Sequence, residues 1–173
     1  IAGDESLIAE LDAFITKQIS KPRDTGKLQS DVADMRERIA KEYASDNPWD
    51  IKYVRGGLID IDFIAQYLIL CHAPSLTKIK SGSADDIFTM LKQANLLDEK
   101  TADALLAANK FLDQLFNILR LCSDNKFDEK TAPEGLKKLL VETMKEKDFE
   151  QLNNHLLQTE KTVYEYYIKT LLS

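Results

Sequence analysis

Residues 58–72 constrain the fold of this 173-residue chain more than any other segment, because they are apolar on nearly every side. Asp62 and Gln66 lie four positions apart and share one narrow polar face. A helix that is hydrophobic almost all round belongs in the interior of a larger structure. The sequence therefore predicts that this segment is the central helix of a bundle, with Phe63 and Leu68 buried.

Outside this segment, apolar residues recur at steps of three and four positions, which is the pattern of amphipathic helices. The helices predicted in this way cover residues 7–19, 29–44, 83–95, 99–123, 134–145 and 149–172. Together with residues 58–72 they indicate an all-α fold, a compact bundle of about seven helices. We expect residues 1–173 to form a single helical domain.

One segment departs from this period. In residues 49–55, Trp49, Ile51 and Tyr53 alternate with Asp50 and Lys52, as in an extended chain. No second strand is apparent that could pair with it. We therefore expect one extended segment before the central apolar helix. It is either solvated and irregular or docked on a partner domain.

Composition excludes several classes of partner. The formal net charge of −6 argues against binding to a nucleic acid backbone, which needs a cationic face. No apolar run approaches the roughly 18 residues that a membrane span requires, and no signal-peptide pattern is present. We therefore expect a soluble, cytoplasmic protein with no membrane partner. Cys71 and Cys122 lie in apolar helical patterns, which indicates buried, reduced thiols.

A basic stretch leads into two glycines and then into the predicted central helix. Lys52 and Arg55 precede Gly56 and Gly57. Free N–H groups at a helix N-terminus favour anions, and phosphate-handling proteins often combine them with glycines and cations. The two cations could meet a triphosphate or the acidic surface of a partner, or they could be an exposed pair of charges. Residue types alone leave these alternatives open.

Carboxylates in the same region are candidates for a metal site or for structural roles. Asp60 and Asp62 point roughly 200° apart on a helix, so they cannot easily share one Mg²⁺ ion, and we predict no metal site. Alternatively, Asp60 stabilises the helix N-terminus and Asp62 pairs with a nearby cation. Arg36 and Arg38 are expected to form ion pairs on a helix surface. Ser83 or Asp85 is expected to cap the helix predicted at residues 83–95.

Two stretches carry a resemblance to a known family. They read DVADMRER at residues 31–38 and WDIKYVRGGLIDIDFIAQYL at residues 49–68. Together they resemble the glutamine synthetase adenylyltransferase family, whose pattern is Met-Arg, then Asp-Leu-Lys, then Gly-Gly-Leu-x-Asp-Ile-Glu-Phe and Gln-Tyr-Leu. Asp62 stands where that family usually has Glu. The chain is most similar to the C-terminal helical domain of the adenylylating half.

The resemblance implies a bifunctional parent enzyme. One half transfers AMP from ATP to a tyrosine of glutamine synthetase, the other removes it by phosphorolysis, and glutamine and the PII signalling protein set the balance. ATP and Mg²⁺ are bound mainly by a nucleotidyltransferase domain in the same polypeptide, with a Gly-Ser and an Asp-x-Asp pair. Gly82-Ser83 followed by Asp85-Asp86 has the wrong spacing for that signature and lies where helix caps are expected. No catalytic residue is therefore expected, and the isolated chain should be inactive.

On this interpretation the chain is a C-terminal fragment of a larger enzyme. It begins with Ile1 rather than Met and ends at Ser173, just after an apolar helix. The residues expected to lie near bound ATP are Lys52, Arg55, Gly56, Gly57, Asp60 and Asp62. Two alternatives keep the same fold: an interaction module that docks glutamine synthetase or PII without touching nucleotide, and a purely structural bundle that stabilises its neighbour.

Overall fold

The computed structural model describes residues 3–76, 82–122 and 127–172, and over these ranges the chain is helical with no β-strand. The elements are α1 (Glu5–Ile19), α2 (Thr25–Glu42), α3 (Leu58–His72), the short 3-10 helix η1 (Ala73–Ser75), α4 (Ala84–Gln93), α5 (Glu99–Cys122), α6 (Glu134–Met144) and α7 (Phe149–Leu171). The predicted all-α fold is confirmed. Helix α2 begins earlier than expected, because the Asp24 carboxylate caps it by accepting a bond from the Lys27 N–H at 3.0 Å.

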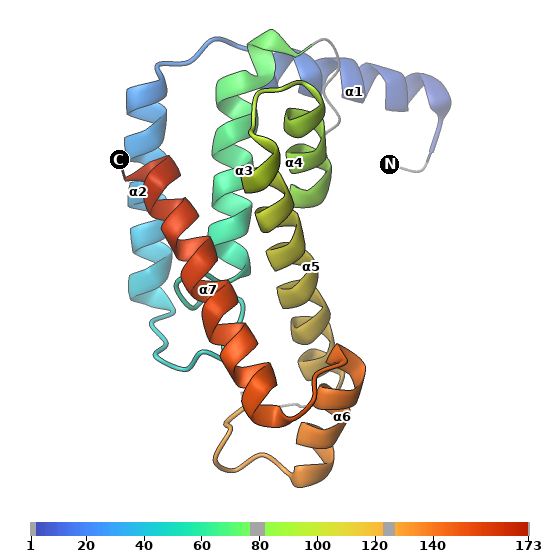
Figure 1. Ribbon diagram of the computed structural model, residues 1–173. Coiled ribbons are helices and arrows are strands. Elements are labelled where there is room, and N and C mark those ends of the chain that lie inside the picture. Colours follow the sequence, from blue (N-terminus) through green and yellow to red (C-terminus); the bar gives the residue numbers. More distant parts are fainter. Residues whose placement is uncertain (1–2, 77–81, 123–126, 173) are drawn as a thin grey trace.

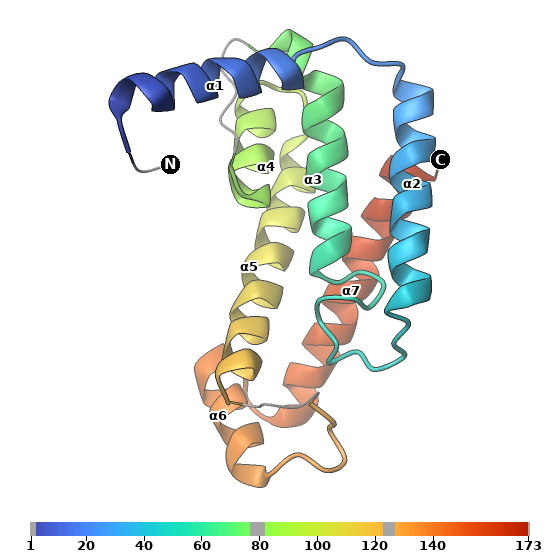
Figure 2. The ribbon, with the colours of Figure 1, turned by 180° about the vertical axis from the view of Figure 1, so that it is seen from behind.

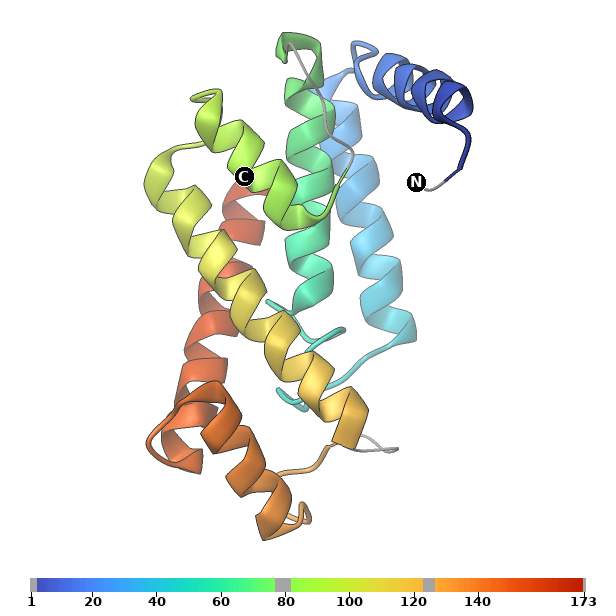
Figure 3. The same ribbon diagram turned by 90° about the vertical axis from the view of Figure 1, so that its right-hand side faces the viewer.

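Helix α3 runs through the middle of the bundle and contacts α2, α4, α5 and α7 (Figure 1). Helices α2 and α3 lie side by side, and in the reverse view α5 lies on the other side of α3 from α2 while α7 passes behind (Figure 2). Helix α6 packs against α5 and α7 at one end of the molecule, while α1 extends outward at the other end (Figure 3). The central position of α3 is thus as its apolar sequence predicts.

The core is built from aliphatic side chains of α3, α4, α5 and α7. Its fully buried members include Ile61, Ile64, Phe88, Leu91, Leu105, Leu112, Leu115, Leu152, Leu156, Val163 and Tyr167. Phe63 and Leu68 were expected to be buried, but both are only half-buried against this cluster. The inward face of α3 is instead the one with Ile61 and Ile64, because Asp62 and Gln66 turn their side of the helix to solvent.

The prediction of an extended segment at residues 49–55 is wrong. The segment is a series of turns in which Asp50 O accepts bonds from Tyr53 N–H and Val54 N–H, at 2.9 and 3.1 Å. With no neighbouring strand available, the backbone groups pair locally. The alternation of apolar and polar residues arises because Trp49 and Ile51 are buried in the core of this same domain, whereas Lys52 points outward.

The two cysteines are free, but their burial differs from expectation. Cys71 is half-buried in the last turn of α3, and burial raises the pKa of its thiol. Cys122 is exposed at the end of α5, where the apolar stripe continues beyond the packed core and leaves Leu121 exposed as well. The prediction of a buried thiol is therefore wrong for Cys122.

The predicted cap of α4 is confirmed. Ser83 Oγ accepts a bond from the Asp86 N–H, and the Asp86 carboxylate accepts one from the Ser83 N–H at 3.0 Å. This reciprocal capping box accounts for the Ser83 and Asp86 pattern without any catalytic role. Among the described residues, no helix has the length and apolarity needed to span a lipid bilayer.

The buried face of α3 should dominate stability. Ile64→Ala removes a side chain that is 0% exposed, so we expect a loss of about 2–5 kcal/mol in the free energy of unfolding. The matched control is Ile168→Ala, on the exposed face of α7, which should cost less than about 1 kcal/mol. Urea denaturation of both variants measures the difference. Equal losses would contradict a central position for α3.

Candidate functional site

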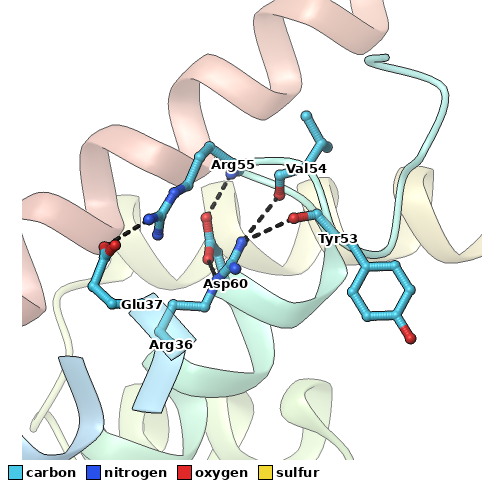
Figure 4. Close-up of polar contacts among 7 residues, drawn as sticks. Arg36, Glu37, Tyr53, Val54, Arg55 and Asp60 are labelled. Atoms are coloured by element: carbon cyan, nitrogen blue, oxygen red, sulfur yellow. Dashed lines mark hydrogen bonds and ion pairs between the residues drawn. The ribbon is translucent and has the colours of Figure 1, made fainter. Parts of the chain in front are cut away.

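A buried ion pair lies beneath the predicted site. The Arg36 guanidinium of α2 donates from Nε to the Asp60 carboxylate of α3, and both side chains are 0% exposed. The Arg36 Nη2 atom donates to the carbonyl oxygens of Tyr53 and Val54 at 3.1 and 3.3 Å (Figure 4). One arginine therefore links α2, α3 and the turn before α3.

This finding corrects the expectation that Arg36 forms an ion pair on the surface of α2. Arg36 follows Val32 by four positions and precedes Ile39 by three, so it lies on the inward stripe of the helix. Its neighbour Met35 is 58% exposed. The signal was present in the spacing, but a charged residue type argued against burial.

Asp60 uses both carboxylate oxygens inside the protein. Oδ1 accepts from Arg36, and Oδ2 accepts a bond from the Gly56 N–H at 2.5 Å. The carboxylate also lies in the first turn of α3, where the helix dipole favours a negative charge. Asp60 therefore fixes the turn that precedes α3. Asp62 is exposed, as expected for residues that point in different directions along one helix.

The two glycines allow close packing within the domain. Gly56 has a φ of +81°, and a Cβ atom there would lie 1.9 Å from the Glu160 carbonyl oxygen of α7. A Cβ on Gly57 would lie 2.3 Å from the Ile51 carbonyl oxygen. The close neighbours of this backbone are thus α7 and the turn itself. Substitution at either position is expected to disturb the fold.

The N-terminus of α3 is occupied by the same turn. Gly57 N–H donates to Val54 O at 3.0 Å, Leu58 N–H to Ile51 O at 2.9 Å, and Ile59 N–H to Lys52 O at 3.2 Å. These are the N–H groups that would otherwise bind an anion. An anionic ligand at this site would therefore meet side chains rather than the helix terminus.

Lys52, Arg55 and Asp62 form the outer part of the predicted site. Arg55 Nη2 pairs with the Glu37 carboxylate at 2.6 Å, with the Arg55 side chain 32% exposed (Figure 4). Its guanidinium also lies 6.0 Å from the centre of the Tyr164 ring. The contact with Glu37 holds the Arg55 guanidinium against α2, and the contact with Tyr164 holds it against α7.

Lys52 is exposed, and its ammonium lies 5.1 Å from the centre of the Tyr53 ring. That ring stacks on Tyr43 with centroids 4.4 Å apart. Asp62 is also exposed. Partial burial by neighbouring protein atoms raises the pKa of its carboxyl, and the positive charge of Lys52 opposes this rise without cancelling it. The six predicted residues thus divide into an inner group, Gly56, Gly57 and Asp60, and an outer group, Lys52, Arg55 and Asp62.

One titratable residue next to this turn, Glu160 of α7, was not predicted from the sequence. Glu160, whose backbone meets Gly56, is 6% exposed, and its Oε1 atom has no hydrogen-bond partner among the described residues. Burial raises the pKa of its carboxyl to about 8. The sequence signal is its place on the apolar stripe of α7, four positions after Leu156 and three before Val163.

The sequence of this chain matches the model of a known protein family. A family model described as GlnD PII-uridylyltransferase matches residues 25–171. The match begins at the first residue of α2 and ends at the last residue of α7. The chain therefore belongs to this family, and its helical bundle is the shared domain.

The chain is also similar to curated proteins that share one name. A bifunctional glutamine synthetase adenylyltransferase/adenylyl-removing enzyme of Rhodopseudomonas palustris is 37% identical over 94% of the chain, which corresponds to 16% of that relative. Proteins of the same name from Bradyrhizobium diazoefficiens and Rhizobium meliloti are 36% and 34% identical over 84% and 94% of the chain, or 15% and 17% of the relatives. The resemblance inferred from residues 31–38 and 49–68 is confirmed. The chain spans about a sixth of the length of these relatives.

Removing one partner of the buried pair should be strongly destabilising. Arg36→Ala leaves the Asp60 charge buried and unpaired, so we expect a loss of about 3–5 kcal/mol in the free energy of unfolding. Arg38→Ala, an exposed arginine on the same helix, should cost less than about 1 kcal/mol. Denaturant unfolding compares them. If the two variants are equally stable, the Arg36 pair does not hold the turn.

The Glu160 carboxyl should make stability depend on pH. Between its ordinary value of 4.5 and about 8, the unfolded state is ionised while the folded state keeps the proton. Stability should therefore fall as pH rises through this window, by at most about 1.4 kcal/mol per pH unit from this group, and level off above it.

Glu160→Gln should flatten this profile, whereas Glu165→Gln, at an exposed position of the same helix, should leave it unchanged. Unfolding measured from pH 5 to pH 9 tests the effect. Parallel profiles for wild type and Glu160→Gln would show that the carboxyl is already ionised in the fold.

Proposed function

We propose that the chain is a helical accessory domain of an enzyme that transfers AMP from ATP to a tyrosine of glutamine synthetase. In this proposal the other half of the enzyme removes the AMP by phosphorolysis. The observation that carries it is the 37% identity over 94% of the chain to a relative named for both activities. The match covers only 16% of that relative, which agrees with one domain of a longer nucleotidyltransferase.

The catalytic chemistry belongs to a nucleotidyltransferase domain of the same polypeptide, outside residues 1–173. That domain would hold most of the ATP and the Mg²⁺. The residues described here do not fit a metal site, because among them no group of three or more His, Cys, Asp or Glu side chains gathers. The isolated chain should therefore transfer no AMP. A cytoplasmic location follows from this role.

The contribution of this domain is to place two cations at the edge of the active-site cleft. The buried Arg36–Asp60 pair fixes the turn, which carries the exposed Lys52 and the half-buried Arg55. Positioned cations stabilise the charge that develops in phosphoryl-type transfer. The exposed pair between Arg55 and Glu37 is weak, so a phosphate can compete with the Glu37 carboxylate for the guanidinium.

A second candidate function is an interaction module that docks glutamine synthetase or PII without touching nucleotide. The occupied N-terminus of α3 favours it, since only side chains remain to meet a ligand. The exposure of large side chains also favours it: Met35 on α2 is 58% exposed and Tyr43, which follows the last residue of α2, is 45% exposed. Kinetics of the full-length enzyme separate the two functions.

In the full-length enzyme, Lys52→Ala and Arg55→Ala should each lower kcat/KM for ATP in adenylylation by about tenfold or more, because each removes a positioned charge. Removal of AMP should change much less, since it belongs to the other half. Lys41→Ala, an exposed lysine of α2, is the matched control.

Adenylylation should be measured at subsaturating ATP, with and without PII. Wild-type kinetics in both alanine variants would rule out a contact with ATP. A changed response to PII with unchanged ATP dependence would support the interaction module instead.

A further inference from the structure

Helix α1 exposes a row of large apolar side chains. Leu7, Leu11 and Phe14 are 55%, 39% and 60% exposed, and their spacing of four and three positions places them on one face. We call these three residues the outer stripe. Helix α1 contains no buried residue at all. The outer stripe therefore has no covering element within the described part of the chain.

The direction of α1 is nevertheless fixed at its C-terminal end. Ile19 packs against the core cluster, and Arg23 donates to the carbonyl oxygens of Ile19 and Gln18 at 2.6 and 2.9 Å. Asp4 caps the other end. The helix thus extends outward from the bundle (Figure 3), and the side chains of its outer stripe are exposed. A 15-residue helix is marginally stable in water unless its apolar face packs against something.

We infer that the outer stripe docks on a part of the parent polypeptide that lies outside residues 1–173. This inference rests on the proposed function, in which the chain is one domain of a longer enzyme. The family model begins at Thr25, but the alignment with the Rhodopseudomonas palustris relative covers 94% of the chain and therefore extends into α1. Most of the length of that relative lies outside the matched region. The outer stripe is a contact between the shared bundle and that remainder.

The charge around the outer stripe defines the chemistry of its partner surface. Glu10 flanks one edge of the stripe, beside Phe14, whereas Glu5 and Asp12 lie on the far side of the helix. With Asp4 at the cap, four carboxylates stand against Lys17, a net charge of −3 (four negative, one positive). The complementary surface is an apolar patch in a region of net positive charge.

A second copy of the chain fits the outer stripe poorly. Two helices that each carry a charge of −3 repel one another. Stable interfaces between separate chains also engage about 20–30 residues a side, far more than the three of the outer stripe. Within one polypeptide a small surface suffices, because the effective concentration of the partner reaches the millimolar range.

Hydrogen exchange of residues 5–19 tests the inference. We expect their amides to exchange about tenfold or more slowly in the full-length polypeptide than in residues 1–173, because docking suppresses local opening. Leu7→Ser combined with Phe14→Ser should abolish this difference. Leu157→Ser, at an exposed leucine of α7, should leave it intact.

Equal exchange in the long and short chains would overturn the inference. Protection that appears in residues 1–173 and grows with concentration would also overturn it, because the occupant would then be a second copy. The proposed function is judged by adenylylation kinetics. Normal adenylylation with an unprotected α1 would therefore reject the docking surface alone, and a protected α1 without adenylylation would reject the function alone.

Discussion

The buried ion pair between Arg36 and Asp60 joins α2, α3 and the turn between them. A buried pair of charges contributes little net stability when compared with well-packed apolar residues. Further hydrogen bonds stabilise the Arg36–Asp60 pair: two backbone carbonyls accept from the guanidinium, and the Gly56 N–H donates to the carboxylate. Such a network gives its members a fixed geometry. The shape of residues 52–57 depends on that geometry.

Helix α7 holds the same turn from the other side. Gly56 lets its backbone approach Glu160, and the Tyr164 ring, one helical turn further along, lies beneath the Arg55 guanidinium. Three helices thus converge on one short turn whose outer side chains are cationic. The proposed function uses this arrangement to present positive charge to a neighbouring domain. Helix α1 contributes a separate, apolar contact toward the remainder of the polypeptide.

Most of the fold could be predicted from the sequence, because each helix carries a clear apolar period and α3 is apolar almost all round. The failures have local causes. The alternation of apolar and polar residues at 49–55 is the pattern of a strand, but in the structure this segment is a series of turns that bury Trp49 and Ile51. Of the candidate site, the cations Lys52 and Arg55 could be proposed from residue type. The spacing of Arg36 on α2 indicated an inward position, but its pairing with Asp60 could not be predicted, since pairing between distant charges depends on how α2 packs on α3.

Hydrogen exchange at the Gly56 and Gly57 amides tests this account most directly, because both amides lie in a turn and would ordinarily exchange quickly. The Gly56 N–H donates to the buried Asp60 carboxylate and the Gly57 N–H to Val54 O. We predict that both amides are protected about as strongly as those in the middle of α3, and that Asp60→Asn removes the protection at Gly56. Exchange at the rate of an exposed loop in the wild-type protein would show that the ion pair does not fix the turn.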